Sequence, residues 1–338
     1  MVGAALALLL AASPAPESPP PVCDDRDLFC DQAVAAGVLR RFHLPSAQAL
    51  AKQGYVGIRV FTVDGHGGYL PVVSVLRRGA SGPTIEAHDA GKPRREAPAS
   101  DATWRAAVSL SAVLKAGPSS YVLTDPEAIC LHSWTFAIEV IEPDGVTVRA
   151  RDTCALEQTG IDAQALSNAA ADANPGCERL SRDSYQGIPA FRLRACFTLA
   201  ASRRGVAADA VNAWEASPMA DGGRGGPRPE DWLTPDVLLN WPDRGPMRGR
   251  DALAKFWRIV TNEDSEKSPS DLGLGVTIVR YQSARAISDR RVRITGELWL
   301  DDDPDRGAAE FIQEWALGDD GRWRMARWIV GDFEAKGR

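Results

Sequence analysis

The chain has 338 residues, of which 44% are hydrophobic and 25% are charged, proportions that are ordinary for a globular protein. This length is enough for about two domains, each with its own apolar core. The formal net charge of −6 excludes the basic character that is typical of nucleic-acid-binding proteins, so no nucleic-acid partner is expected.

Residues 1–22 combine an apolar run from Val2 to Ala12 with a proline-rich stretch. This order is typical of a signal peptide followed by a stiff tether, with cleavage expected after Ala12. The run is too short to cross a bilayer as a helix, so no transmembrane segment is expected. Because no Lys or Arg precedes the run, the true translation start stays open. We therefore expect a periplasmic or secreted protein.

Six cysteines fall before residue 200, and no two of them form a Cys-x-x-Cys pair. An even number of cysteines in an exported chain favours disulfides over a zinc site. Their connectivity stays open, since six cysteines allow about fifteen pairings. The six are Cys23, Cys30, Cys130, Cys154, Cys177 and Cys196.

Residues 27–54 are predicted to be helical, with a break at Pro45 and with Ser46 as the cap of a second short helix. Residues 55–63 and 69–76 alternate in hydrophobicity, and the glycine-rich turn between them predicts a β-hairpin.

The next segment, residues 81–101, is polar and rich in Gly and Pro, which predicts a surface loop. Together with the elements that follow, these features predict an α+β domain over residues 23–200, of a family that the sequence does not reveal. The elements are a helix over 103–115, a hairpin of 134–142 and 146–151, a helix over 161–172 and a last strand over 190–200.

The composition changes near Ser202, which predicts a boundary and a second domain over residues 201–338. Eight of the ten tryptophans fall beyond this point, and no cysteine does. The core of the second domain is therefore expected to rest on aromatic packing. Residues 221–229 are rich in glycine and are predicted to form a flexible loop.

The order of elements in the second domain is distinctive. A helix over 206–216 is followed by LTPDVLLNWP, by GRDALAKFWRIV with one apolar stripe of helical spacing, and by strand-like runs that end in FIQEWALGDDGRWRMARWIVGDF. This order resembles the nuclear transport factor 2-like superfamily, which includes the ketosteroid isomerases and the SnoaL-like cyclases. The resemblance implies an α+β fold in which a curved antiparallel sheet packs on helices around a cone-shaped pocket. Such folds host unrelated functions, so no reaction follows from it.

The isomerase branch of the superfamily implies three catalytic roles. Its catalytic Asp falls at Trp241 in this chain, or at Asn240 or Asp243 if the alignment shifts. Its oxyanion-hole acid falls near Gln313, an amide that donates hydrogen bonds but is no acid. No Tyr stands in the first helix. We therefore predict no catalytic residue.

Two carboxylates on predicted strands, Glu297 and Glu314, are candidates for a pocket acid with a pKa raised by burial. The strand over 291–300 alternates, which places its charged residues on the face opposite its apolar ones. Arginines lie close in register, so a ladder of opposite charges on an exposed face is the favoured interpretation.

The predicted ligand-binding residues are Asn240, Trp241, Trp257, Trp299, Gln313 and Trp328. Aromatic side chains with a polar edge suit a flat or apolar ligand, although the tryptophans would equally well fill a core. No cofactor or metal is predicted, since the four histidines are scattered and the acidic run at 301–305 lacks the spacing of a calcium loop.

The sequence thus predicts an exported two-domain protein whose C-terminal domain binds a small apolar ligand or forms a homodimer through its sheet, without catalysis. The alternative is an isomerase- or cyclase-type enzyme acting in the same pocket. A third interpretation is a structural envelope protein. The identity of the ligand, the oligomeric state and the role of the first domain stay open.

Overall fold

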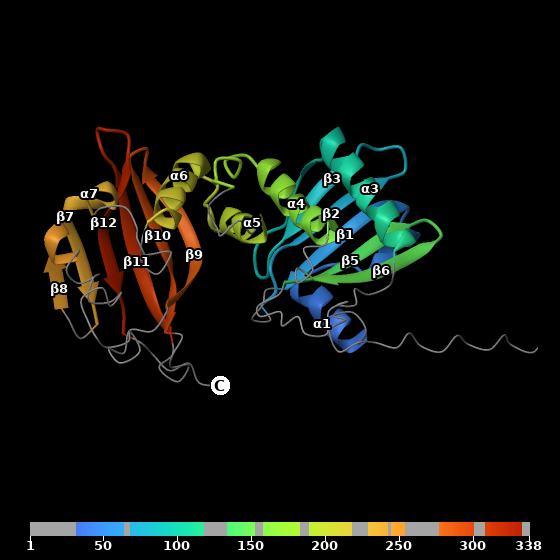
Figure 1. Cartoon of the computed structure of the whole chain (residues 1–338), viewed down its shortest axis with the longest axis horizontal. Coiled ribbons are helices and arrows are strands. Elements are labelled where there is room, and N and C mark those ends of the chain that lie inside the picture. The colour runs from blue at the N-terminus through green and yellow to red at the C-terminus, as the bar shows by residue number, and fades with distance from the viewer. Residues whose placement is uncertain are drawn as a thin grey trace, which may run out of the picture.

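Two six-stranded sheets joined by helices make up the protein in this computed structural model (Figure 1). The structure describes residues 32–63, 68–117, 134–152, 158–182, 189–217, 229–242, 245–253, 277–300 and 308–332. None of the helices in these ranges is long and apolar enough to cross a membrane. The mixed helix and sheet content agrees with the predicted α+β class.

The first sheet has the strand order β4-β3-β2-β1-β5-β6, and all its neighbouring strands are antiparallel. Both faces of this sheet carry buried apolar side chains, and helices cover each face (Figure 1). Helices α3 (Asp101–Ala116) and α4 (Gln158–Asp172) lie on one face, and α1 (Gln32–Arg41) and α2 (Ala47–Lys52) lie on the other. The strands are β1 (Tyr55–Val63), β2 (Val72–Arg78), β3 (Thr84–His88), β4 (Arg95–Pro98), β5 (Thr135–Glu142) and β6 (Gly145–Asp152).

Local sequence signals fix several of these elements. Ser46 caps α2 and Ser100 caps α3, and each side chain accepts a hydrogen bond of 3.1 Å from the backbone N–H three residues later. Gly57 in β1 has a φ of +144°, and a Cβ there would lie 2.0 Å from the carbonyl oxygen of Val75. Only glycine fits this close approach of β1 to β2.

The second sheet has the order β8-β7-β12-β11-β10-β9, in which β12 and β7 are parallel and the other neighbours are antiparallel. Helix α6 (Arg204–Glu215) packs on one face of it through Trp214. We call this face the inner face and the opposite one the outer face. The remaining elements are α7 (Pro229–Trp232), β7 (Leu233–Trp241), β8 (Gly245–Arg248), β9 (Thr277–Ser288), β10 (Arg291–Leu300), β11 (Ala308–Leu317) and β12 (Trp323–Val330).

The two sheets are joined through helix α5 (Pro189–Thr198) and the segment that follows it. Leu199 forms a parallel bridge with Ala284 of β9, and the N–H of Ala200 donates to the carbonyl of Ala284 at 2.9 Å. Buried apolar residues of both sheets, including these, form one continuous core. The predicted division into domains at residue 200 therefore stays a prediction.

Many predicted elements are confirmed. The two hairpins form β1 with β2 and β5 with β6, and the predicted helices correspond to α3, α4 and α6. In the second half, the strand predicted over 291–300 is β10, and the two later strands are β11 and β12. In the two hairpins and in α3, a hydrophobic pattern coincides with a turn or cap signal.

The surface loop predicted over 81–101 is wrong, because this segment contains β3 and β4. Ile85 and Ala87 are buried at alternate positions of β3, and the backbone of β3 pairs with β2 over five residues. The Gly and Pro residues lie in the turns on either side of β3 and at Pro98, the last residue of the edge strand β4. An edge strand tolerates proline since it needs hydrogen bonds on one side only.

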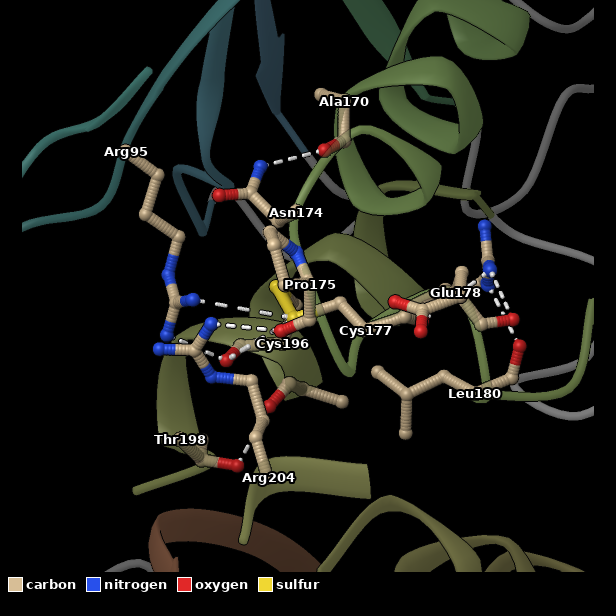
Figure 2. Close-up of a disulfide and its surroundings, with 12 residues drawn as sticks. Arg95, Ala170, Asn174, Pro175, Cys177, Glu178, Leu180, Cys196, Thr198 and Arg204 are labelled. Atoms are coloured by element: carbon tan, nitrogen blue, oxygen red, sulfur yellow. Dashed lines mark hydrogen bonds between the residues drawn. A yellow bond between two sulfur atoms is a disulfide. The ribbon is translucent and has the colours of Figure 1, made fainter. Parts of the chain in front are cut away.

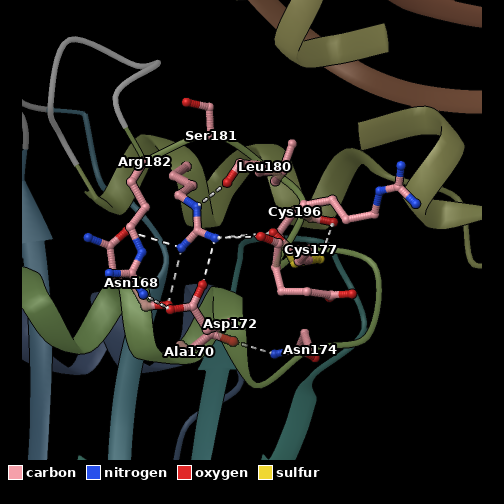
Figure 3. Close-up of polar contacts among 12 residues, drawn as sticks. Asn168, Ala170, Asp172, Asn174, Cys177, Leu180, Ser181, Arg182 and Cys196 are labelled. Carbon is pink, nitrogen blue, oxygen red and sulfur yellow. Dashed lines mark hydrogen bonds and ion pairs between the residues drawn. A yellow bond between two sulfur atoms is a disulfide. The ribbon is translucent and has the colours of Figure 1, made fainter. Parts of the chain in front are cut away.

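The last strand predicted over 190–200 is also wrong, because the segment is helix α5. The sequence alternates between apolar and arginine residues, but Arg192 is as buried as its apolar neighbours. Its guanidinium donates to the Leu180 carbonyl at 2.9 Å, to Asp172 at 2.7 Å and to Asn168 at 3.2 Å. These acceptors lie together beside the end of α4 (Figure 3). Because a charged residue is expected at an exposed position, the burial of Arg192 made the apolar pattern look like that of a strand rather than a helix.

One disulfide lies in the described part of the chain, between Cys177 and Cys196 (Figure 2). Both residues are fully buried, and the bond fastens α5 to the turn that follows α4. This confirms a disulfide for two of the six cysteines.

Several predictions fall outside the described residues. They are the signal and tether at 1–22, the helix start at 27–31, the turn at 64–67, the other four cysteines, most of the loop at 221–229, the helix over 250–260 beyond Leu253 and the acidic run at 301–305.

Candidate functional site

A row of four buried side chains crosses the inner face of the second sheet. Ile294 of β10 lies opposite Gln313 of β11, Gln313 lies opposite Trp328 of β12, and Trp328 lies beside Leu239 of β7. All four side chains are buried. Strand alternation places them there, since odd positions of β7 and β11 and even positions of β10 face inward. The sequence predicted this alternation for β10.

Three further tryptophans lie beside this row, and together with Trp328 they form a chain of edge-to-face contacts. The rings of Trp214 and Trp315 are 6.2 Å apart, those of Trp214 and Trp328 are 5.9 Å apart, and those of Trp328 and Trp241 are 5.8 Å apart. Such T-shaped contacts stabilise an aromatic core by about 0.5–1.5 kcal/mol for each pair. The described tryptophans thus act at least as core residues, which is the structural interpretation left open by the sequence.

Gln313 is the polar residue at the centre of this aromatic core. Its side chain is 0% exposed, and its Oε1 accepts a hydrogen bond from Trp315 Nε1 at 3.1 Å. The side-chain N–H2 of Gln313 has no partner within the described ranges, and neither does the indole N–H of Trp328. A buried donor without an acceptor costs about 1–3 kcal/mol. Two such donors on adjacent strands therefore need an explanation.

The structure does not bring all six predicted ligand-binding residues together. Trp241, Gln313 and Trp328 lie on the inner face, whereas Asn240 is exposed on the outer face. Adjacent strand residues point to opposite faces, so Asn240 and Trp241 cannot line the same surface. Trp257 lies outside the described residues, and of Trp299 only the backbone, in β10, is described.

The outer face of the sheet carries the two predicted pocket acids. Glu314 pairs with Arg293 on the neighbouring strand, with 2.8 Å between the Glu314 Oε1 and Arg293 Nη2 atoms. Glu297 lies on the same side of β10 as Arg293, between the inward-facing Gly296 and Leu298. The charge-ladder interpretation is confirmed at Glu314 by its pair with Arg293, and the general-acid interpretation stays a prediction. Among the described residues, no three His, Cys, Asp or Glu side chains gather in a group that could hold a metal ion.

A buried ion pair in the first sheet was not predicted from the sequence. Arg59 of β1 lies opposite Glu139 of β5, with 2.7 Å between Arg59 Nε and Glu139 Oε2, and the two side chains are 0% and 6% exposed. Burial raises the pKa of Glu139, an effect that Arg59 partly offsets. Arg59 also donates to the Pro45 carbonyl at 2.8 Å, which ties the α1–α2 connection to the sheet. The sequence signal was a charged residue inside the apolar run of each strand, Arg59 in β1 and Glu139 in β5.

Comparisons with known proteins identify a fold likeness only. No protein-family model matches the chain, and no curated protein sequence is significantly similar to it. Solved structures match about a third of its length.

Three of these structures illustrate the likeness. A nuclear transport factor 2-like protein of unknown function from Shewanella oneidensis has 16% identity and a TM-score of 0.28, with 37% of this chain and 97% of that one covered. A protein from Parabacteroides distasonis, provisionally named a ketosteroid isomerase, has 15% identity and a TM-score of 0.23, with coverages of 35% and 76%. A similarly named protein from Shewanella frigidimarina has 11% identity and a TM-score of 0.28, with coverages of 39% and 98%.

The resemblance stated from the sequence is thus found again among solved structures, for a segment of about a third of the chain. At these identities and TM-scores the likeness carries no argument about function. The site is therefore interpreted from its own contacts.

Proposed function

We propose that the inner face of the second sheet binds a small, largely apolar molecule that carries a hydrogen-bond acceptor, without catalysing its conversion. The observation that carries this proposal is the pair of buried donors, Gln313 Nε2 and Trp328 Nε1, which have no acceptor in the described part of the chain. An acceptor atom of a ligand would satisfy both donors and remove their desolvation cost.

The surroundings favour a neutral acceptor such as a carbonyl oxygen. Gln313 is the one buried polar residue of strands β7 to β12 among the residues described, and no charged side chain is buried beside it. A carboxylate would lose its hydration there without gaining a cationic partner. The rings of Trp214, Trp241 and Trp328 would contact the apolar body of the ligand.

The non-catalytic part of the proposal rests on the carboxylates. Both candidate acids, Glu297 and Glu314, belong to the outer face, on the far side of the sheet from Gln313. General acid–base catalysis needs a group within hydrogen-bond reach of the reacting atom. An isomerase- or cyclase-type enzyme remains the alternative function, and it would need an acid other than these two.

A matched pair of probes tests the acceptor requirement. 2-Decalone carries a carbonyl, and decalin has nearly the same shape without one. Titration of the full chain, followed by tryptophan fluorescence, is expected to give saturable binding of 2-decalone at least about tenfold tighter than of decalin. A flat response to both probes would contradict the proposal.

Two variants assign the effect to the site. Gln313→Met keeps the volume and removes the donor, so it is expected to abolish the preference for the ketone. Glu314→Gln is the matched control, since it changes the next residue on the opposite face and is expected to keep the preference. Equal behaviour of the two variants would show that binding occurs elsewhere.

Association through the outer face is a second candidate function. Ile312 is 38% exposed at the centre of β11 on this face, beside the Arg293–Glu314 pair. Exposed apolar residues within a charged sheet suit a symmetric contact between two copies. Sedimentation is expected to detect a dimer that Ile312→Lys weakens, and a wild-type monomer at all concentrations would remove this candidate.

Export of the chain is likewise part of the proposal. The buried Cys177–Cys196 disulfide supports it, since such bonds persist in oxidising compartments. Cell fractionation is expected to recover a shortened chain outside the cytoplasm, and a full-length cytoplasmic product would contradict export.

A further inference from the structure

We propose that Arg95 of β4 and Arg204 of α6 form a binding site for a small tetrahedral oxyanion, of the phosphate or sulfate class, beside the Cys177–Cys196 disulfide. This site lies at the junction between the two sheets and is independent of the inner face of the second sheet.

Arg95 is held in place by contacts that do not neutralise it. Its Nη2 donates to the Cys196 carbonyl at 2.8 Å, and its Nη1 lies 3.8 Å from the Cys177 sulfur. The guanidinium also stacks over the ring of Phe197, with 5.1 Å to the ring centroid. These contacts fix the position of the guanidinium and leave N–H groups available for a ligand.

Arg204 approaches the same disulfide from the start of α6. Its Nη1 donates to the Pro175 carbonyl at 2.8 Å. The turn at Gly176 packs so closely on Arg204 that a Cβ at this glycine would lie 2.7 Å from the Arg204 Cβ, so the stem of the side chain is held firmly. Both guanidinium groups lie on the same side of the disulfide (Figure 2).

The two arginines differ from their neighbours in lacking a carboxylate. Arg179 pairs with Asp209, Arg192 with Asp172 and Arg203 with Asp289. In the described part of the chain, Arg95 and Arg204 donate to backbone carbonyls and the disulfide only, and the buried Nε of Arg204 has no acceptor.

The missing counter-charge has an electrostatic consequence. Burial and, to a smaller extent, the nearby positive charge of Arg204 together lower the pKa of Arg95 to about 10. Two partly buried like charges repel each other, and an anion between them relieves the repulsion for both.

The chemistry of the two groups indicates the ligand class. A guanidinium offers planar pairs of N–H donors that match the oxygens of a phosphate or sulfate, and two such groups bind more oxygens than a carboxylate presents. Both side chains are half-buried, so a small ion can reach them from solvent.

Calorimetric titration of the full, disulfide-bonded chain tests the site. At constant ionic strength, inorganic phosphate and sulfate are expected to bind saturably with a dissociation constant of about 1 mM or below. Glycerol phosphate is a third probe. If it binds more tightly than phosphate, the natural ligand is a phosphate monoester, and if it binds more weakly, the natural ligand is the free ion. The absence of saturable binding for all three probes would overturn the proposal.

Substitutions assign the binding to the two arginines. Arg95→Gln and Arg204→Gln are each expected to weaken phosphate binding by at least about tenfold. Arg203→Gln removes an equal charge one residue away, from an arginine already paired with Asp289, and is expected to change affinity less than about twofold. Arg204→Gln removes no buried ion pair, so it carries the test even if Arg95→Gln fails to fold. If Arg204→Gln bound phosphate with the same affinity as the wild type, the proposed site would be overturned.

Discussion

The two halves of the chain differ in the partners of their most deeply buried polar side chains. In the first half of the chain, the buried Arg59 has Glu139 as a charged partner, and the buried Arg192 has Asp172. In the second half, the buried donors of Gln313 and Trp328 have no acceptor among the described residues. Paired groups hold elements together, whereas a donor without a partner costs stability. If the second sheet binds a ligand as proposed, that ligand supplies the acceptor for these donors, whereas the two ion pairs of the first half need no additional molecule.

The largest expected loss of folding stability follows from a change in the core of the first sheet. Glu139→Ala leaves the fully buried Arg59 without its counter-charge, so the free energy of unfolding is expected to fall by about 3–5 kcal/mol. Urea denaturation measures this loss. The control is Glu142→Ala, which removes the partner of Lys115 at the far end of the same strand, where both side chains reach solvent. Equal losses in the two variants would contradict the role of the buried pair.

A smaller, pH-dependent effect is expected at Glu86 of β3. The hydrogen bond with His88, and to a lesser extent the charge of Arg94, lowers the pKa of this carboxyl in the folded state. A depressed folded pKa stabilises the fold above the unfolded value of about 4.3, and this contribution is lost as the pH falls through the folded pKa. The stability gap between wild type and Glu86→Gln should therefore narrow on acidification. A gap that is constant from pH 6 to about pH 3 would contradict this account.

The stability of the second sheet is expected to change little when the side-chain donor of Gln313 is removed. Gln313→Met removes an unsatisfied N–H2 group and also the acceptor of the Trp315 indole, and the two effects oppose each other. We expect the free energy of unfolding without ligand to change by less than about 1 kcal/mol. A loss as large as that of Glu139→Ala would show that Gln313 serves the fold rather than a ligand.

The smallest effect is expected on the outer face. Glu314→Gln breaks the pair with Arg293, whose side chain is 51% exposed. Solvent screens such pairs, so the expected loss is at most about 0.5 kcal/mol and should vanish at high salt. A larger loss, insensitive to salt, would mean that another surface covers this face.

The sequence predicted the elements whose patterns were unambiguous. The hairpin of β5 and β6 follows from its Pro-Asp-Gly turn, and β10 follows from clean alternation. Helix α5 could not be predicted in this way, because burial of Arg192 depends on acceptors from α4 and from the turn after it. Strand β3 was hidden by the Gly and Pro residues of its flanking turns.

The candidate site could be predicted only in part. The resemblance to the superfamily drew attention to Gln313. Strand alternation places its side chain on the same face as those of Phe311 and Trp315. The same rule would have excluded Asn240, which stands between the inward-facing Leu239 and Trp241. The pairing of Gln313 with Trp328 depends on the register of β11 and β12, with a bulge between Glu314 and Trp315 that no local pattern specifies.

NMR of the tryptophan indole N–H groups is the most direct test of the proposed ligand site. The Trp328 resonance is assigned by its loss in Trp328→Phe, and Trp104 of α3, in the first half, is the internal reference. With 2-decalone, the Trp328 indole proton is expected to move downfield as it gains an acceptor, while that of Trp104 stays fixed. A Trp328 resonance that stays fixed at saturating ketone would contradict the account.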